Sequence, residues 1–196
     1  MLMQAIVDFI LELDRLKAVE RKTRPLGLQR PENSAEHSWQ IAMLALSLLP
    51  HAAEPVDGDR VVRLLLVHDI GEIDTGDVLV YHDDGAAERK RAERAAVERI
   101  FGLLPAAQGA ELLALWQEFD DAATPEARFA HAADRAMPAL LNLAAGGQSW
   151  VEHGISHARV VARIGPPIEA GCPALWAWMK ARLDAERERG WFGMGG

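Results

Sequence analysis

The sequence predicts an all-α protein, a single bundle of about 7–9 helices. Alanine and leucine dominate, β-branched residues never form alternating runs, and several segments repeat apolar side chains with the 3.6-residue period of a helix. With 196 residues, 49% of them hydrophobic, the chain can bury one sizeable core. We therefore expect one domain over residues 1–190 and a flexible C-terminal tail over residues 191–196.

Composition and charge restrict the partners. A formal net charge of −8 argues against a nucleic acid polymer, because such binders need clustered Lys and Arg. The single cysteine, Cys172, excludes an internal disulfide and fits a reducing compartment. No apolar run reaches the roughly 18 residues of a membrane span, and the N-terminus carries acids instead of the basic start of a signal peptide. We therefore expect a cytoplasmic protein with no membrane partner.

The first helix is expected over about residues 2–20, where Ile6, Phe9 and Leu13 follow the helical period. A basic loop comes next. It places four positive charges against the one negative charge of Glu20, on Arg21, Lys22, Arg24 and Arg30. Two interpretations stay open: a solvated surface loop, or an anion-recognition segment, since guanidinium groups match the geometry of phosphate.

The second helix is announced by Asn33 followed three residues later by Glu36, which is the pattern of a capping box. Glu36 is therefore interpreted as a capping residue and not as a catalyst. His37 lies in the first turn, and Ile41 and Leu44 continue its stripe at i+4 and i+7. Such a histidine faces the core, where it is either hydrogen-bonded structure or a ligand.

The third helix, expected over about residues 61–70, runs from an apolar stretch straight into His68 and Asp69. Burying an imidazole and a carboxylate there costs several kcal/mol unless the charge is compensated. A divalent metal is the simplest compensator, because neutral imidazole and ionised carboxylate are ligands that such ions accept. Glu72 follows His68 by four residues and shares its face if the helix continues.

Five more helices are expected, over about residues 86–104, 109–120, 125–145, a shorter segment to 164, and 173–189. Pro166-Pro167 is expected to break the chain. In the 125–145 helix, Asp134 lies in an apolar stripe, and Pro138 lacks the N–H that would bond its carbonyl. A buried carboxylate at this position indicates a ligand, with the neighbouring Arg135 as its alternative, structural partner.

Four side chains from three expected helices, each on a core face or at a helix end, therefore become candidate metal ligands: His37, the pair His68 and Asp69, and Asp134. Two imidazoles and two carboxylates leave a six-coordinate divalent ion two open positions for water or substrate. Mn, Co, Fe, Ni, Zn or Mg would suit, so the identity of the single expected ion stays open. No role is assigned to four other histidines, His82, His131, His153 and His157.

The pattern H…HD…D, carried by these four residues, resembles that of the HD-domain metal phosphohydrolases. Four blocks in order resemble the 5′-deoxynucleotidase-like branch: LKAVER at 16–21, RPENSAEHS at 30–38, HDIGE at 68–72, and GD at 76–77. The resemblance extends to about residue 185. It implies an HD-domain helical bundle with the metal site in its core, and a homodimer.

The resemblance also implies roles for individual residues. The four candidates would be the metal ligands, Glu72 would handle the proton of the attacking water or of the leaving group, and Arg21 would grip the phosphate. Asp77 would hold the sugar 3′-hydroxyl or assist Glu72. Lys22 stands where the deoxynucleotidases carry a tryptophan near the sugar, which leaves the deoxyribose preference open.

The expected function is that of a metal-dependent phosphohydrolase, a phosphomonoesterase in which metal-activated water attacks the phosphorus of a (deoxy)nucleoside 5′-monophosphate. Two alternatives stay open. The substrate could instead be a nucleoside triphosphate, a cyclic nucleotide or a phosphorylated metabolite. The protein could also be a non-catalytic helical protein that binds a metal or a nucleotide.

Overall fold

The structure is a computed structural model that describes residues 2–79, 81 and 85–193. All regular secondary structure in these residues is helical, and one isolated antiparallel bridge joins Glu20 to Asn33. The prediction of an all-α fold is confirmed.

Within the described residues, eight α-helices have ten or more residues, which agrees with the expected number. They are α1 (Leu2–Leu13), α2 (Ser34–Leu48), α3 (Gly58–Val67), α5 (Ala86–Phe101), α6 (Ala106–Asp121), α7 (Pro125–Ala144), α9 (His157–Gly171) and α10 (Pro173–Arg187). The shorter helices are α4 (Glu72–Thr75), α8 (Gln148–Glu152) and the 3₁₀ turns η1 (Asp14–Ala18) and η2 (Leu49–His51).

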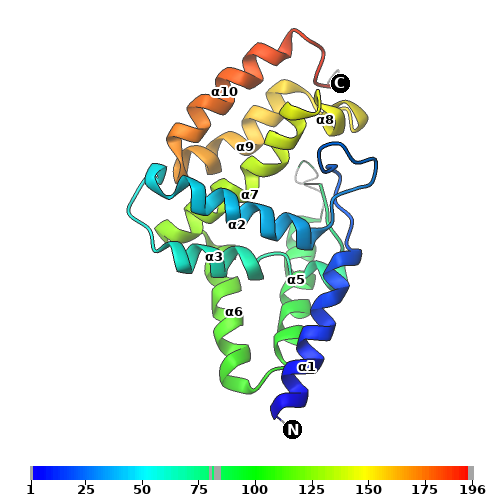
Figure 1. Cartoon of the computed structure of the whole chain (residues 1–196), viewed down its shortest axis with the longest axis vertical. Coiled ribbons are helices and arrows are strands. Elements are labelled where there is room, and N and C mark those ends of the chain that lie inside the picture. The colour runs from blue at the N-terminus through cyan, green and yellow to red at the C-terminus, as the bar shows by residue number, and fades with distance from the viewer. Residues whose placement is uncertain (1, 80, 82–84, 194–196) are drawn as a thin grey trace.

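Helix α7 lies at the centre of an elongated molecule (Figure 1). It packs against α9 on one side and against α2, α3 and α6 on the other, and α10 covers α9. Helix α1 lies with α5 and α6 toward one end of the molecule, and α8 and α10 lie toward the opposite end (Figure 1). Thr124 caps α7, with its side chain accepting a hydrogen bond from Ala127 N, and Pro125 occupies the first helical position.

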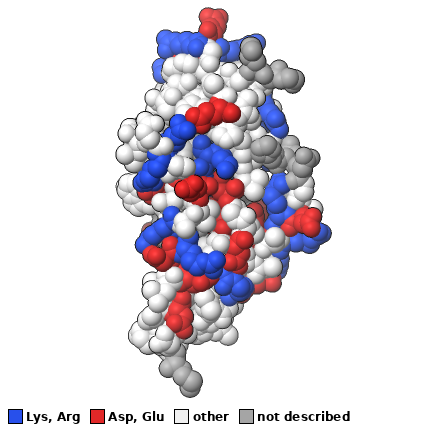
Figure 2. Space-filling model, turned by 90° about the vertical axis from the view of Figure 1, so that its right-hand side faces the viewer, with Lys and Arg blue, Asp and Glu red and all other residues white. Residues whose placement is uncertain are grey.

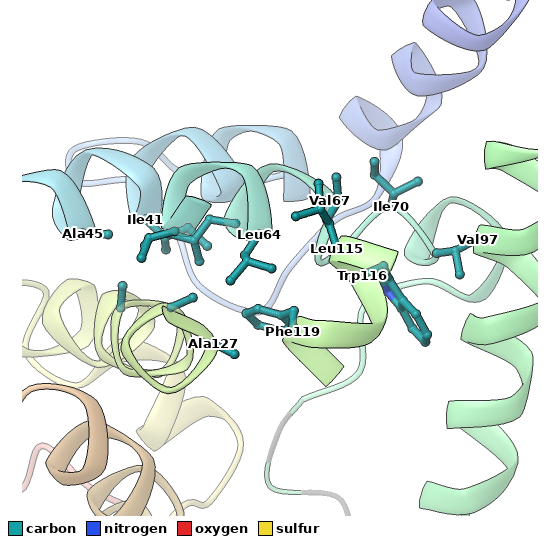
Figure 3. Close-up of a cluster of buried hydrophobic side chains, with 14 of the residues drawn as sticks. Ile41, Ala45, Leu64, Val67, Ile70, Val97, Leu115, Trp116, Phe119 and Ala127 are labelled. Carbon is teal, nitrogen blue, oxygen red and sulfur yellow. The ribbon is translucent and has the colours of Figure 1, made fainter. Parts of the chain in front are cut away.

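The larger apolar core joins α2, α3, α5, α6 and α7 (Figure 3). Ile41, Leu64 and Val97 are fully buried in it. Two of its aromatic residues also hold the end of α3. Trp116 donates from Nε1 to the carbonyl oxygen of His68 at 3.2 Å, and the Phe119 ring lies 5.0 Å from the His68 ring. The core therefore fixes the chain where α3 stops.

The expected break at Pro166-Pro167 is wrong, because α9 continues through both prolines to Gly171. Each proline removes one helical hydrogen bond, a loss on the order of 3 kcal/mol. Tertiary packing offsets it: Ile164 and Ile168 are buried, and each is worth about 1.5–3 kcal/mol. Gly165 also lies so close to the Trp176 ring that an added Cβ would come within 2.7 Å of it.

Residues 191–193, which the sequence assigned to a flexible tail, are packed. The Phe192 ring stacks on that of Trp150 at 4.9 Å, and Gly193 N donates to Ile155 O at 2.9 Å. The remaining tail residues, 194–196, lie outside the described residues. In the described part of the chain, no helix combines the length and the apolar character that a membrane crossing requires.

Candidate functional site

His68 lies where α3 ends and the chain turns toward α4. Its side chain is almost completely buried, and Nδ1 lies 2.8 Å from the carbonyl oxygen of Leu65. A carbonyl can only accept, so Nδ1 carries the proton of this contact and Nε2 is left for other partners. Nε2 lies 3.0 Å from Asp69 Oδ1.

His37, from the first turn of α2, and Asp134, from the middle of α7, complete the cluster. His37 Nε2 lies 3.0 Å from Asp134 Oδ1, and His68 Nε2 lies 3.7 Å from the same oxygen. One ligand atom from each of His37, His68 and Asp69 lies within 4.8 Å of the others. The structure thus brings together all four side chains that the sequence proposed as metal ligands.

The two histidines of the cluster have pKa values shifted in opposite directions. Burial acts to lower the pKa of His68, but the carboxylates of Asp69 and Asp134 outweigh it and raise that pKa to about 10. Burial and the nearby Arg21 instead lower the pKa of His37 to about 4, although His37 faces Asp134 as well. For His68 the attraction of Asp69 and Asp134 outweighs burial, whereas for His37 burial and the positive charge of Arg21 outweigh the attraction of Asp134.

These residues fit a divalent cation. His68 Nε2 is buried without an aligned hydrogen-bond partner, although two carboxylates lie within 4 Å of it. A nitrogen lone pair facing two carboxylates is unfavourable unless a proton or a metal ion lies between them. The pKa of Asp134 is lowered well below its usual value despite its burial, chiefly by Arg135 and by the two imidazoles, so the carboxylate stays ionised as a ligand must.

Arg21 enters the cluster from the basic loop. Its side chain is 12% exposed, and Nη1 donates to Asp69 Oδ2 at 2.9 Å and lies 3.4 Å from Asp77 Oδ1. Asp69 therefore faces His68 with one oxygen and Arg21 with the other. Although burial opposes it, these acids raise the pKa of Arg21, so a fixed positive charge lies beside the candidate metal ligands. Arg21 is therefore not a solvated surface residue, and its role in anion recognition stays a prediction.

Glu72 is the first residue of α4, and its Oε2 accepts a hydrogen bond from Ser34 Oγ at 2.6 Å. It does not share a continuous helix with His68, because α3 stops at Val67. Burial, together with the charges of Asp69 and Asp77, raises the pKa of Glu72 to about 9. Burial also raises the pKa of Asp77, against the opposing effect of Arg21.

Sequence reasoning assigned no role to three polar residues that support this cluster: Thr23, Glu32 and Ser34. All three are buried. Ser34 bonds Glu72, and Thr23 Oγ1 donates to Glu32 Oε2 at 3.0 Å. They lie in or directly after an irregular loop, where no hydrophobic period shows which side chains point inward. Glu36, in contrast, forms the predicted capping box with Asn33.

Lys22 is exposed and lines the mouth of the cavity. Three of the unassigned histidines have protein partners. His131 lies 2.7 Å from the carbonyl oxygen of Phe119, His153 lies 2.9 Å from that of Ser149, and His157 Nε2 lies 3.0 Å from Asp184. His153 follows α8 and His157 begins α9, so their spacing does not place them on one helix. His82 lies outside the described residues.

A cavity of about 280 Å³ extends from the cluster to the space between α7, α8 and α9. Its acidic end is lined by Arg21, His68, Asp69, Glu72, Asp77 and Asp134. Its aromatic end is lined by Tyr81, Asn142, Ser149, Trp150 and Ile164. The volume suits a small molecule. On the face drawn in Figure 2, Lys and Arg side chains lie around Asp and Glu side chains near the middle of the molecule. The negative net charge therefore does not exclude an anionic ligand.

Comparison with known proteins identifies relatives of this chain. Residues 13–176 match the HD domain family. A crystal structure described as a predicted metal-dependent phosphohydrolase from Magnetospirillum magnetotacticum MS-1 is 43% identical, with a TM-score of 0.91 and 98% of each chain covered. The PH0347 protein of Pyrococcus horikoshii OT3, 20% identical with a TM-score of 0.62 over 93% of this chain and 98% of that one, shares the fold. The 5′-deoxynucleotidase HDDC2 of Homo sapiens is 31% identical over 133 residues, which are 67% of this chain but only 64% of that protein.

Proposed function

The chain belongs to the HD-domain family, and on that premise we propose that it is a metal-dependent phosphohydrolase that cleaves phosphate monoesters of small metabolites. One observation carries the proposal. Asp69 faces the imidazole of His68 with Oδ1 at 3.0 Å, and its other oxygen, Oδ2, accepts a hydrogen bond from Arg21 Nη1 at 2.9 Å. A candidate cation site and a fixed guanidinium therefore adjoin at one carboxylate, and a phosphoryl group is the anion that such a pair stabilises.

His37, His68, Asp69 and Asp134 would hold the ion. A divalent cation bound there neutralises charge on a phosphoryl oxygen and lowers the pKa of a water molecule. Glu72 orients the attacking water and accepts its proton, with Oε2 held by Ser34 and Oε1 left for the proton. A nearby positive charge favours ionised Glu72, which opposes the burial that raises its pKa to about 9.

Arg21 and Asp77 act on the substrate in this proposal. The contacts of Arg21 with Asp69 and Asp77 use Nη1, which leaves Nη2 for a phosphoryl oxygen. Asp77 holds a sugar hydroxyl or assists Glu72, and Lys22 contributes positive charge from the mouth of the cavity. Their action is binding and charge stabilisation, which is the largest part of catalysis in phosphoryl transfer.

For the substrate we propose a (deoxy)nucleoside 5′-monophosphate. The curated relatives from Homo sapiens and Bos taurus, each named a 5′-deoxynucleotidase, support this class. The cavity supports it too, because it extends from the acidic end to an end lined by aromatic and amide side chains that can accept a ring system. Lys22, in place of the tryptophan of the deoxynucleotidases, leaves the choice between ribose and deoxyribose to experiment.

The test is a substrate panel on purified protein from which metals have been stripped. Mn²⁺, Co²⁺, Mg²⁺ or Zn²⁺ is added back, and phosphate release is measured with ribo- and deoxyribonucleoside monophosphates, nucleoside triphosphates, cyclic nucleotides and sugar phosphates. We expect metal-dependent release that is fastest with the nucleoside monophosphates. Faster release from another class would change the substrate. Metal binding without release from any ester would favour the non-catalytic alternative.

A homodimer and a cytoplasmic location stay predictions. The structure offers an exposed apolar stripe on α2 that would suit contact with a second copy. Trp39 is 66% exposed, Met43 49% and Leu46 42%, and their spacing places them on one helix face. The two tryptophans of the last helix differ in exposure: Trp176 is buried and Trp178 is exposed. The molar mass in solution, measured by light scattering, tests the dimer.

A further inference from the structure

Glu32 is a buried acid that the proposed mechanism does not use. It lies at the end of the basic loop, directly before the cap of α2, and is only 1% exposed. Its Oε2 accepts a hydrogen bond from Thr23 Oγ1 at 3.0 Å. The same oxygen lies 3.6 Å from Arg21 Nε and 3.8 Å from His37 Nδ1. One carboxylate oxygen is thus shared by a hydroxyl and two nitrogens from different parts of the chain.

Both of these nitrogens lack a hydrogen-bond partner. Arg21 Nε and His37 Nδ1 are buried, and neither makes a hydrogen bond among the described residues. Buried donors are rarely left unpaired in native proteins, so two that face the same acceptor require an explanation. The other ends of the two side chains are engaged: His37 Nε2 faces Asp134, and Arg21 Nη1 bonds Asp69. Glu32 therefore lies behind both side chains on the side away from the acidic end.

We infer that Glu32 is a positioning residue that holds His37 and Arg21 through Oε2 when the site binds a metal and a phosphate. The inference rests on the proposed roles of these two residues. A histidine that ligates through Nε2 keeps its proton on Nδ1, and a carboxylate accepting from Nδ1 fixes the tautomer and the orientation of the ring. An acceptor at Nε likewise fixes the plane of the guanidinium.

The backbone holds Glu32 firmly enough for this role. Arg21 N donates to Glu32 O at 2.8 Å, and Glu32 N donates to Thr23 O at 2.9 Å, so the two ends of the loop are hydrogen-bonded to each other. The bridge between Glu20 and Asn33 continues this pairing. Because the main chain of Glu32 is held from both sides, its carboxylate offers a fixed point. Glu32 Oε2 lies 3.6 Å from Arg21 Nε and 3.8 Å from His37 Nδ1, so small movements of these two side chains would shorten both contacts to hydrogen bonds.

The alternative is that Glu32 only anchors the loop, and metal binding separates the two roles. In the full-length protein, Glu32→Gln is expected to weaken Mn²⁺ affinity by about 10–100-fold, the range seen when the partner of a ligating histidine is removed. Inorganic phosphate, tested as an inhibitor with Mn²⁺ saturating, should also bind more weakly. A pure anchor would lower the thermal midpoint and leave both affinities of the folded protein at the wild-type value.

Glu36→Gln is the matched control, since Glu36 is an acid of the same segment that caps α2 and pairs with Arg30. It should keep the wild-type Mn²⁺ affinity. If Glu32→Gln does not fold, Thr23→Val removes the hydrogen bond that orients Oε2 and should weaken Mn²⁺ binding in the same direction, by less. Wild-type affinities in a folded Glu32→Gln or Thr23→Val protein would overturn the inference alone. A wild-type protein that binds no Mn²⁺ would overturn the proposed metal site together with it.

Discussion

The two ends of the cavity differ in whether their polar groups have hydrogen-bond partners within the protein. At the aromatic end the polar groups of Asn142, Trp150 and Tyr81 are paired: Asn142 accepts from Ser149 N at 2.9 Å and donates to Pro138 O at 3.0 Å, and Trp150 donates to Tyr81 at 3.3 Å. At the acidic end His68 Nε2 is buried without an aligned partner, and burial together with the charges of Asp69 and Asp77 raises the pKa of Glu72 to about 9. The polar groups of the aromatic end are paired within the protein, whereas those of the acidic end need a bound ligand as a partner.

This difference agrees with the proposed location of the chemistry at the acidic end. Unpaired buried polar atoms and displaced pKa values destabilise a fold, and proteins keep them mainly where function requires them. A satisfied hydrogen-bond network instead specifies shape. We therefore expect changes at the acidic end to remove metal binding or turnover, and changes at the aromatic end to act on stability and substrate affinity.

The largest effect is expected from Asp69→Ala. The substitution removes a candidate ligand and also the acceptor that holds Arg21 Nη1. Because the cation and the guanidinium together supply several kcal/mol of transition-state stabilisation, kcat/KM should fall by roughly 10⁴-fold or more. Elemental analysis should show metal lost from a protein that is still folded by circular dichroism. Phosphate release at the wild-type rate would eliminate the metal assignment.

Glu72→Gln should separate turnover from metal binding. Gln keeps the size of the side chain and can still accept from Ser34, but it cannot take up a proton. General acid–base catalysis contributes about 10²–10⁴-fold, so kcat should fall by roughly 10²-fold or more while the metal content stays that of the wild type. A parallel loss of metal would instead identify Glu72 as a ligand.

The acidic end was largely predictable from the sequence, for a physical reason. His68, Asp69 and Asp134 are polar residues in otherwise apolar stripes, so the helical period alone predicts that they are buried. A buried imidazole or carboxylate requires a partner, which points to a ligand. Glu32 and Ser34 gave no such signal, because their direction is set by the backbone pairing of an irregular loop, which follows no hydrophobic period. The roles of Glu72, Asp77 and Arg21 came from the family resemblance and not from periodicity.

The aromatic end was not predicted at all. Asn142 and Trp150 look like ordinary helix residues, and only the packing of α7, α8 and α9 turns them toward the cavity. The same packing keeps α9 helical through Pro166-Pro167, where local propensity predicted a break. Local rules therefore fail in this region because tertiary contacts dominate it.

Arg21→Lys tests whether the guanidinium binds phosphate or only supports Asp69. Lysine keeps the charge but cannot reach Asp69 and a phosphoryl group with separate nitrogens. We expect kcat/KM for a nucleoside monophosphate to fall by about 10–100-fold, mainly through KM, with Mn²⁺ affinity nearly unchanged. An unchanged kinetic profile would remove Arg21 from the substrate site. A loss of Mn²⁺ affinity alone would make it a support for Asp69.

The smallest effect on turnover is expected from Asn142→Ala at the aromatic end. The substitution leaves the buried Ser149 N without its acceptor, a loss of about 1–3 kcal/mol. For a domain of this size the thermal midpoint should fall by about 2–4 °C for each kcal/mol. Mn²⁺ affinity and kcat should match the wild type, and KM for a nucleoside monophosphate should change only a few-fold. A loss of Mn²⁺ affinity as large as that from Asp69→Ala would show that the two ends are not independent, because the packing of α8 on α7 would then be holding Asp134 in place.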